Sequence, residues 1–359
     1  MKIDYNFKGK RVIVTGHTGF KGSWLVAWLK MLGARVTGIG LNPYTKPSNF
    51  EVSSIGKNID DFRVDIREQK RLYNIFEDSK PDFVFHLAAQ ALVRKSYDNP
   101  TETWQTNVIG TLNILEALRK LKNPCTAVLI TSDKCYDNVE WVWGYRENDS
   151  LGGPDPYSAS KGAAELLIKS YVKSYFPKEN TNIRVASARA GNVIGGGDWS
   201  IDRIVPDCVK AWSKSEVVEL RNPHATRPWQ HVLEPLSGYI SLASHLSEEI
   251  NLHGEAFNFG PQAQQNKSVL ELVVSMQKTW NKVKFQDISD KIKGPYESGL
   301  LKLNCDKALH LLGWSAIMDF NQTVEFTSEW YKSYYSGKEM ELFTTNQIKQ
   351  YTEIGRKKV

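Results

Sequence analysis

The chain has 359 residues, a formal net charge of +6, 41% hydrophobic residues and 24% charged residues. A chain of this length and composition buries a substantial hydrophobic core and forms one large or two modest domains. No run approaches the roughly 18 apolar residues of a membrane-spanning helix, the first residues lack the apolar core of a signal peptide, and Lys and Arg are dispersed, which argues against a membrane or a nucleic acid as a partner.

The four cysteines, Cys125, Cys135, Cys208 and Cys305, are scattered along the chain and form no Cys-x-x-Cys pair. Structural zinc sites are usually built from such pairs. The spacing therefore predicts reduced thiols, a cytoplasmic location and no metal site.

The first predicted element is a buried strand at 11–15, which leads into a glycine-rich turn at 16–22 and an apolar helix at 23–32. Glycines let the backbone approach a pyrophosphate, and the amides and dipole of the following helix stabilise its negative charge. Glycines also punctuate ordinary turns, but the flanking strand and helix favour a dinucleotide-binding corner. The residues expected to contact the cofactor here are Gly16, Thr18, Gly19, Phe20 and Gly22.

A second strand is predicted at 34–41, and it runs into Asn42 and Pro43. An NAD site usually carries an Asp or Glu at this point for the adenosine ribose, whereas a nearby Arg accommodates the 2′-phosphate of NADP. The sequence shows no acidic residue and no obvious Arg at this corner. We expect NAD rather than NADP as the cofactor, with the ribose contact unassigned.

Strands and helices then alternate, with strands at 62–65, 82–89, 127–130 and 183–188 and helices at 67–79, 101–121 and 157–175. This order predicts an α/β fold in which a doubly wound parallel sheet, a Rossmann fold, occupies about residues 1–190. Cofactor contacts are expected at the strand ends, from Asp65 and Ile66 near the adenine and from Leu87, Ala88 and Ala89 near the ribose. His86 is expected to be a packed core histidine, and Asn107 is expected to brace the active-site backbone.

The strand at 127–130 ends in Thr131-Ser132-Asp133-Lys134, at the carboxyl edge of the sheet, where ligands bind in open α/β folds. Tyr157 and Lys161 are four residues apart, so they lie on one face of the next helix. An ammonium one turn away favours the phenolate, which lets a tyrosine take a proton from a hydroxyl group. A Tyr-x-x-x-Lys pattern alone would be an ordinary solvated helix pair, but the glycine turn and the polar strand end favour catalysis. The expected catalytic residues are Ser132, Asp133, Lys134, Tyr157 and Lys161.

An aromatic-rich segment at 141–147 separates these two groups. It is either a hydrophobic lid or substrate wall, or a loop packed on the core, and the sequence favours neither.

Residues 191–335 are expected to form mainly a smaller substrate-binding part, with helices at 204–214 and 235–246 and strands at 217–220 and 256–259. Elements around 230–260 are expected to return to the sheet, and 336–359 form a tail of unknown role. Arginine suits a diphosphate because its planar group binds two oxygens at once. At least two of the three arginines should line the pocket. The expected substrate contacts are Asn192, Arg203, Arg221 and Arg227, with His231 as a further polar candidate.

Six motifs carry a resemblance to a known family: 16–22, 131–136, 143–149, 157–161, 189–199 and 226–232. On these motifs the chain, from about residue 8 to about 335, resembles the extended short-chain dehydrogenase/reductase family. Within it, the chain looks most like the CDP-glucose 4,6-dehydratases. Related dTDP-glucose enzymes end the central strand in Thr-Asp-Glu, so Lys134 in place of Glu argues against that substrate and against a carboxylate base there.

The resemblance implies a nucleotide-sugar substrate, NAD and a reaction in three stages. Tyr157, assisted by Lys161 and Ser132, would take the proton of the glucose 4-hydroxyl while NAD+ accepts the C4 hydride. Lys134, kept neutral by burial, would then remove the C5 proton, Asp133 would protonate the departing 6-hydroxyl, and NADH would return its hydride to C6. The product would be CDP-4-dehydro-6-deoxyglucose, an intermediate of deoxysugar biosynthesis for O-antigen and lipopolysaccharide.

The same resemblance implies a homo-oligomer, a dimer or a tetramer, paired through the helices at 101–121 and 157–175. Two alternatives stay open. One is an epimerase, or a 4,6-dehydratase for a dTDP-, GDP- or UDP-sugar. The other is a non-catalytic NAD-binding sensor, which the intact Tyr157 and Lys161 pair argues against.

Overall fold

The computed structural model describes residues 5, 7–179, 181–262, 264–280, 284–289 and 300–358. Its strands are β1 (Arg11–Thr15), β2 (Arg35–Gly40), β3 (Asp60–Arg63), β4 (Phe83–His86), β5 (Cys125–Ile130), β6 (Ile183–Arg189), β7 (Val193–Ile194), β8 (Val218–Leu220), β9 (Thr226–Pro228), β10 (Gln230–His231), β11 (Ala256–Asn258), β12 (Asn266–Ser268) and β13 (Phe285–Asp287). Its α-helices are α1 (Phe20–Met31), α2 (Asn49–Val52), α3 (Gln69–Ser79), α4 (Val93–Asp98), α5 (Pro100–Trp104), α6 (Gly110–Lys120), α7 (Pro156–Tyr175), α8 (Ile204–Ser213), α9 (Leu233–Glu248), α10 (Val269–Met276), α11 (Asp306–Leu312), α12 (Phe320–Tyr335) and α13 (Met340–Lys357). A π-helix at Gln105–Ile109 and 3-10 helices at Asp133–Cys135 and Ile250–Leu252 are also present.

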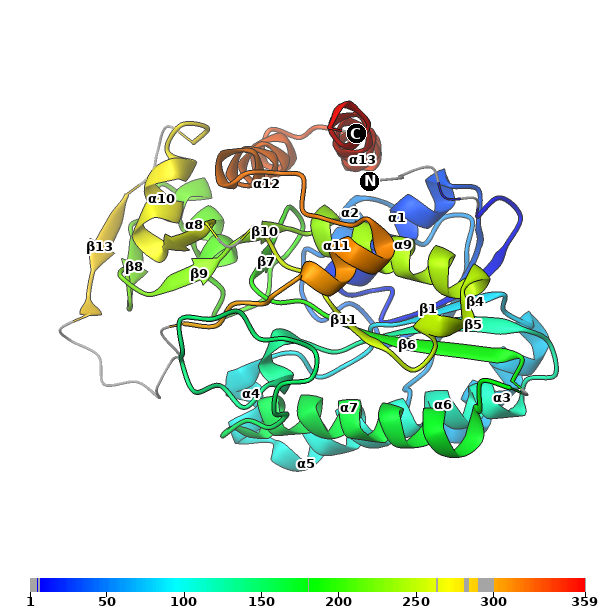
Figure 1. The fold of residues 1–359 in the computed structure, drawn as a ribbon. Helices are drawn as coiled ribbons and strands as arrows, with labels where there is room; N and C mark the ends of the chain where they lie inside the picture. The colour runs from blue at the N-terminus through cyan, green and yellow to red at the C-terminus, as the bar shows by residue number, and fades with distance from the viewer. Residues whose placement is uncertain are drawn as a thin grey trace.

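A seven-stranded sheet in the order β11-β6-β5-β4-β1-β2-β3 forms the centre of the protein, and all of its pairs are parallel. Helices α3, α6 and α7 cover one face, and α1 and α9 cover the other, with α12 and α13 outside them (Figure 1). The predicted doubly wound parallel sheet is confirmed.

Alternation along the central strands explains why both faces are covered. In β1, Val12 and Val14 belong to the core shared with α1 and α9, whereas Ile13 belongs to the core shared with α3 and α6. Successive side chains of a strand point to opposite faces. A strand that is apolar at every position therefore needs a helix layer on each side.

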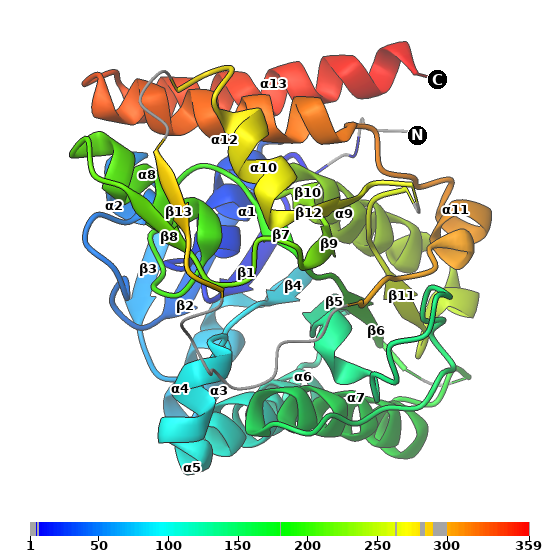
Figure 2. The same cartoon turned by 90° about the vertical axis from the view of Figure 1, so that its left-hand side faces the viewer.

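A smaller part lies beyond the carboxyl edge of the sheet and contains α8, α10 and three two-stranded sheets (Figure 2). Its strands are short and pair as β7 with β10, β8 with β13, and β9 with β12. Because this part faces the carboxyl ends of the parallel strands, it covers the edge where the predicted site lies.

The segment predicted as a single helix at 101–121 contains α5, the π-helix and α6 in succession. A π-helical turn carries an extra residue and often occurs at functional sites. No helix among the described residues is long and apolar enough to span a membrane.

Candidate active site

The glycine-rich turn between β1 and α1 approaches a neighbouring strand closely. Gly16 has a φ of +74°, and a Cβ atom there would lie 2.7 Å from the backbone nitrogen of Ala88, just after β4. Only glycine fits that position without strain. Gly19, the N-cap of α1, offers no side-chain cap to the first amides of the helix. These amides and the narrow turn form a cradle that fits the pyrophosphate of a dinucleotide.

Thr18 and Phe20 position this turn through their side chains. Thr18 Oγ1 donates to the carbonyl oxygen of Leu41 at 2.9 Å, which ties the turn to the end of β2. The ring of Phe20 lies against Gly195, since a Cβ atom on that glycine would be 3.2 Å from the ring. Direct contacts of Thr18, Phe20 and Gly22 with a cofactor stay predictions.

At the corner after β2, the structure places an acidic residue and an arginine that the sequence did not predict there. His17 Nε2 lies 2.8 Å from Asp61 Oδ1. Arg63 pairs with Asp61 at 2.7 Å and donates to the carbonyl oxygen of Leu41 at 3.0 Å. Both an acidic residue and an arginine therefore reach this corner, but from β3. The sequence prediction was wrong because the pairing of Gly40 with Arg63, rather than chain order, brings them together.

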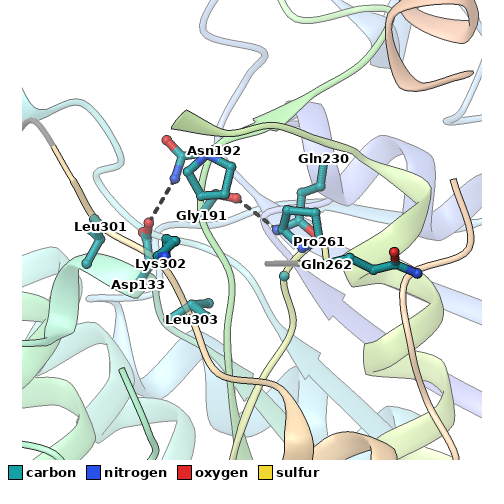
Figure 3. Close-up of a pocket in the computed structure, with 11 residues that line it drawn as sticks. Asp133, Gly191, Asn192, Gln230, Pro261, Gln262, Leu301, Lys302 and Leu303 are labelled. Atoms are coloured by element: carbon teal, nitrogen blue, oxygen red, sulfur yellow. Dashed lines mark hydrogen bonds between the residues drawn. The ribbon is translucent and has the colours of Figure 1, made fainter. Parts of the chain in front are cut away.

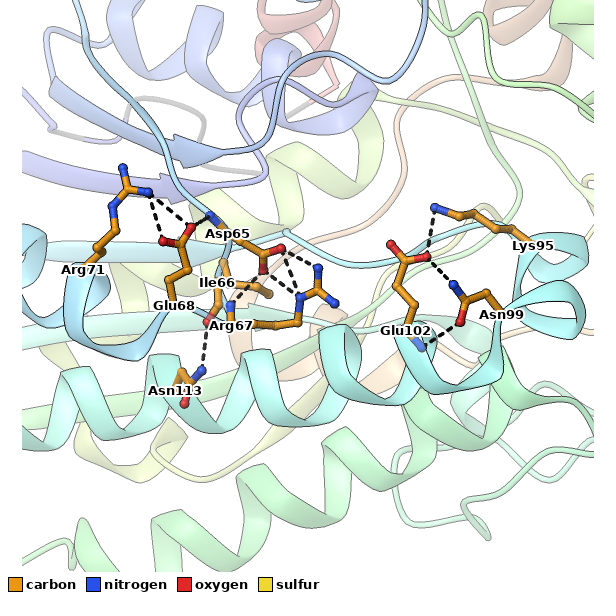
Figure 4. Close-up of polar contacts among 9 residues, drawn as sticks. All are labelled: Asp65, Ile66, Arg67, Glu68, Arg71, Lys95, Asn99, Glu102 and Asn113. Atoms are coloured by element: carbon orange, nitrogen blue, oxygen red, sulfur yellow. Dashed lines mark hydrogen bonds and ion pairs between the residues drawn. The ribbon is translucent and has the colours of Figure 1, made fainter.

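The segment after β3 holds its two predicted cofactor residues in different ways (Figure 4). The Asp65 carboxylate accepts hydrogen bonds from Arg67 at 2.6–3.0 Å, and these bonds lower its pKa. Ile66 is buried, and its carbonyl oxygen accepts from Asn113 Nδ2 at 3.0 Å. The Asp65 carboxylate is thus already paired, and its contact with an adenosine group stays a prediction.

The segment after β4 lies beside the glycine turn. The amides of Leu87 and Ala88 both donate to Thr15, at 3.1 Å to its carbonyl oxygen and 3.2 Å to its hydroxyl. The ring of His86 lies between the hydroxyls of Thr15 and Thr111, and burial lowers its pKa to about 3. It is a packed core histidine, as the sequence predicted. Leu87, Ala88 and Ala89 are half-buried.

Asn107 lies in the π-helix and holds two neighbouring segments. Its side-chain oxygen accepts from the amide of Gln90 at 2.8 Å, and its side-chain nitrogen lies 2.9 Å from Ser160 Oγ, one residue before Lys161. The side chain therefore braces the site backbone, as predicted.

Asp133 lies at the tip of β5 and is held from two sides. Ser132 Oγ donates to its Oδ1 at 2.9 Å. Asn192 Nδ2 donates to its Oδ2 at 3.3 Å, as Figure 3 shows. A Cβ atom on Gly191 would lie 1.8 Å from the same carboxylate, so only glycine permits this approach. Asp133, Gly191 and Asn192 line a small pocket with Gln230. In this structure, Asn192 contacts the predicted acid directly.

Tyr157 lies in the first turn of α7, where Asp155 caps the helix by accepting from the amide of Ser158 at 3.0 Å. Burial raises the pKa of Tyr157 to about 12, and the Asp133 carboxylate acts in the same direction. A hydrogen bond with Ser132 and the charge of Arg203 oppose this shift. In this structure the cost of burying a phenolate outweighs the nearby charges, so the net shift in the pKa of Tyr157 is upward. The expected support of the phenolate by Lys161 stays a prediction.

Lys161, which is buried, and Lys21, which is half-buried, lie at the same edge of the sheet. Burial lowers the pKa of each to about 8. The charges of Arg203 and Lys161 also lower the pKa of Lys21, and that of Asp133 raises it. Lys21 therefore belongs to the site, although the sequence analysis did not select it. The sequence signal that could have identified Lys21 is its position in the first turn of α1, beside the glycines.

Lys134 lies in the 3-10 turn after Ser132 and is half-buried. Its amide donates to Ser132 Oγ at 3.2 Å. Within the described part of the chain its ammonium has no hydrogen bond or ion pair.

The predicted arginines form two separate arrangements. Arg203 pairs with Asp198 at 2.9 Å, and its charge acts on Tyr157 and Lys21. Arg221 pairs with Asp202 at 2.9 Å, and Arg94, from α4, pairs with the same carboxylate at 3.0 Å. Arg94 thus links α4 to the smaller part and is a residue that the sequence analysis missed, because strand and helix periodicity carries no information on such pairing.

The two remaining polar candidates, Arg227 and His231, have different surroundings. Arg227 is half-buried in β9 and donates to the carbonyl oxygen of Thr226 at 2.9 Å. His231 is fully buried between Trp24 and Phe326, and burial lowers its pKa to about 3. The expectation of His231 as a polar site residue is wrong; it is a neutral core residue.

Part of the aromatic segment is packed on the core, and its role as a lid or substrate wall stays a prediction. Tyr145 is buried and stacks on Tyr136 with ring centroids 5.1 Å apart, whereas Trp143 is 71% exposed. The segment is therefore anchored at one end and open to solvent at the other.

Among the described residues, no group of three or more His, Cys, Asp or Glu side chains is arranged to hold a metal.

Comparison with known proteins shows the family of the chain. A family model described as GDP-mannose 4,6 dehydratase matches residues 13–327. The CDP-glucose 4,6-dehydratase of Salmonella typhimurium is 46% identical over 97% of this chain and 98% of its own length. The CDP-paratose 2-epimerase of Salmonella typhi is 26% identical over 73% of this chain and 82% of its own.

Two solved structures share the fold. An epimerase of Methanothermobacter thermautotrophicus has a TM-score of 0.79 at 24% identity, covering 93% of this chain and 95% of its own. A UDP-glucose-4-epimerase of Stenotrophomonas maltophila, solved with bound NAD, has a TM-score of 0.78 at 21% identity, covering 91% and 99%. Since the family model spans most of the chain and a relative with 46% identity covers nearly all of it, the chain belongs to the family described as GDP-mannose 4,6 dehydratase, among the extended short-chain dehydrogenase/reductase nucleotide-sugar dehydratases and epimerases.

Proposed function

We propose that the protein converts CDP-glucose to CDP-4-dehydro-6-deoxyglucose and water. The observation that carries this proposal is the position of Asp133, a buried carboxylate fixed by Ser132 and Asn192. Asp133 also lies close enough to Tyr157 to act on its pKa. Oxidation at C4 requires only a base and a hydride acceptor, whereas loss of the 6-hydroxyl also requires an acid. The 46% identity to a CDP-glucose 4,6-dehydratase supports CDP as the nucleotide.

We infer that the cofactor is NAD, held by the cradle of Gly16, Gly19 and the first amides of α1. When bound, it would accept a hydride from C4 of the sugar and return it to C6. The residues of the chain then have five tasks: to orient the sugar, to exclude water, to take the 4-hydroxyl proton, to remove the C5 proton and to protonate the leaving group.

In this proposal, Tyr157 takes the proton of the 4-hydroxyl, with Ser132 and Lys161 supporting the phenolate. The resulting ketone acidifies the hydrogen at C5, which Lys134 removes and later returns. Asp133, in its carboxylic acid form, donates a proton to the 6-hydroxyl as it leaves, so the carbon–oxygen bond at C6 breaks and water forms. The resulting Asp133 carboxylate takes up a proton again before the next turnover. The proton that leaves the 4-hydroxyl balances the one that enters this water.

Three further parts of the proposal concern binding. Arg203, Arg221 and Arg227 would bind the diphosphate, and Asn192 would contact the sugar while holding Asp133. We also propose a homo-oligomer that pairs through α6 and α7, because Leu166 and Tyr175 on α7 are 57% and 51% exposed. Sedimentation equilibrium distinguishes a monomer from a dimer or a tetramer.

Turnover of CDP-, dTDP-, GDP- and UDP-glucose in deuterated water, followed by mass spectrometry, tests both the reaction and the nucleotide specificity. We expect CDP-glucose to lose the mass of one water and to gain one deuterium at C5, because Lys134 exchanges its proton with solvent. The product of an epimerase would show no loss of water. Faster turnover of another nucleotide-glucose than of CDP-glucose would show that the proposed nucleotide is wrong. Cofactor binding without turnover of any substrate would identify a sensor.

A further inference from the structure

A buried ion pair lies behind the turn that carries Ser132, Asp133 and Lys134. Glu165 on α7 and Arg189 at the end of β6 are 2.8 Å apart, and their side chains are only 4% and 3% exposed. Burying two charges costs desolvation energy, so such a pair is a weak source of net stability. The contacts that the ion pair makes with its neighbours therefore indicate its role at this position.

Each member of the pair binds one end of that turn. Thr131, just before the turn, donates from Oγ1 to Glu165 Oε1 at 2.5 Å. Tyr136, just after it, accepts from Arg189 Nη1 at 2.7 Å. The residues between them are Ser132–Cys135, so the two members of one ion pair hold both ends of the turn that presents the acid.

The same pair is fixed to the element that carries the oxidation residues. Glu165 lies one helical turn after Lys161 and two turns after Tyr157 on α7, and its charge raises the pKa of Lys161 against the larger effect of burial. One carboxylate thus contacts the turn with Asp133 and shares a helix with Tyr157.

We propose that Glu165 and Arg189 are positioning residues that keep the 132–135 turn in register with Tyr157 and Lys161. The inference rests on the proposed function, since a dehydratase needs oxidation and elimination within one site. A displacement of the acid by about 1 Å costs on the order of 100-fold in rate.

Two matched variants separate positioning from general support of the fold. Thr131→Val removes the hydroxyl that ties the turn to Glu165. Ser187→Ala removes another hydroxyl donor, which bonds Glu165 Oε2 at 2.8 Å from within β6 and has no link to the turn. Both variants keep the ion pair, so neither leaves a buried charge alone. Tyr136→Phe tests the other end of the turn.

The first readout needs no catalysis. Cys135 lies within the turn, is fully buried, and has a thiol pKa raised by that burial, so it reacts with a thiol reagent only when the turn opens. We expect labelling of Cys135 to accelerate about tenfold in Thr131→Val, the effect of one lost hydrogen bond. The acceleration should be at least as large in Tyr136→Phe, which also loses the hydrogen bond from Tyr136 Oη to Asn258 Oδ1 at 2.8 Å. Labelling of the buried Cys125 and Cys208 should stay unchanged. Equal labelling of Cys135 in Thr131→Val and Ser187→Ala would overturn the inference.

The second readout measures kcat and KM separately. Thr131→Val should lower kcat by about 10- to 100-fold with KM within about twofold, and reduced cofactor should accumulate because elimination is slowed; Ser187→Ala should match the wild type. A Thr131→Val enzyme with wild-type kcat would overturn the functional part of the inference. If the wild type releases no water from any nucleotide-glucose, the proposed function fails, whereas the labelling result still decides the positioning.

Discussion

At the scale of single residues, the phenol of Tyr157 is the group on which oxidation depends. Burial raises its pKa to about 12 in this structure, whereas the hydrogen bond with Ser132 and the charge of Arg203 act against that shift. We predict that Tyr157→Phe lowers turnover by at least about 100-fold, since that is the usual contribution of general base catalysis. Cofactor affinity should change little, because the ring is kept. Product formation measured by mass spectrometry and cofactor binding measured by calorimetry check the two parts.

Tyr171→Phe is the matched control for that variant. Tyr171 lies on the same helix, and its hydroxyl donates to Glu116 at 3.0 Å, away from the site. It should keep the wild-type rate. If Tyr157→Phe also keeps the wild-type rate, Tyr157 has no part in the chemistry.

Asp133 is the residue that distinguishes elimination from oxidation. We predict that Asp133→Asn still oxidises C4 but fails to release water, because an amide cannot protonate the departing hydroxyl. Single-turnover absorbance should then show reduced cofactor accumulating and persisting. Asp82→Asn, at the amino edge of the sheet, removes an ion-paired carboxylate from the opposite side and should show normal cycling. Loss of C4 oxidation in Asp133→Asn, without accumulation, would contradict this division of roles.

At the scale of elements, α13 is attached to α9 by a buried polar contact. Tyr351 Oη lies 2.8 Å from Glu234 Oε2 and 3.0 Å from Ser237 Oγ. Burial raises the pKa of Glu234 to about 7, and its carboxylate also accepts from the amide of Met318 at 2.6 Å. We predict that Tyr351→Phe lowers the free energy of unfolding by about 1–3 kcal/mol, because a buried hydrogen bond to the Glu234 carboxyl group is lost.

Urea unfolding followed by tryptophan fluorescence measures this difference. Tyr335→Phe serves as the control, because Tyr335 is 39% exposed on α12. Equal stability of the two variants would show that α13 does not depend on the Tyr351 hydroxyl.

At the scale of the whole molecule, the buried neutral histidines make stability depend on pH. The pKa of His86 and of His231 falls from an ordinary 6.5 to about 3 in the folded protein. Below pH 6.5 the unfolded chain therefore binds protons that the folded protein does not, and stability falls as the pH falls from 6.5 toward 3. At pH 5 the loss is about 2 kcal/mol for each histidine.

We predict that His231→Leu reduces the difference in unfolding free energy between pH 7 and pH 5 by about 2 kcal/mol, whatever its effect at pH 7. Glu234 acts in the opposite direction between pH 4.5 and 7, because its pKa is raised, but it is unchanged in the variant. His310→Leu, at an exposed position on α11, should leave the difference unchanged. A difference in His231→Leu equal to that of the wild type would contradict the prediction.

Local patterns in the sequence were sufficient for the main sheet and for much of the site. The apolar runs of β1, β5 and β6 and the long periodic helix α7 were predicted nearly at their observed bounds. Errors occurred where the local pattern was weak. β3 begins two residues before its predicted start, and α10, α11, α12 and α13 were not predicted. In α13, Met340, Ile348 and Tyr351 are buried at helical spacing, which was a usable signal.

The sequence by itself determined which chemistry the chain carries. The glycine turn, the polar end of β5 and the four-residue spacing of Tyr157 and Lys161 are properties of neighbouring residues, and regular strand and helix geometry converts them into positions. These features alone predicted an oxidising site at the carboxyl edge of a parallel sheet.

Only the tertiary structure decided how that chemistry is tuned and held. Asp61 and Arg63 reach the end of β2 through strand pairing, Gly191 admits the Asp133 carboxylate, and burial reverses the expected shift in the pKa of Tyr157. Each of these depends on atoms that are distant in the chain and on the local loss of water, and a one-dimensional pattern contains neither quantity.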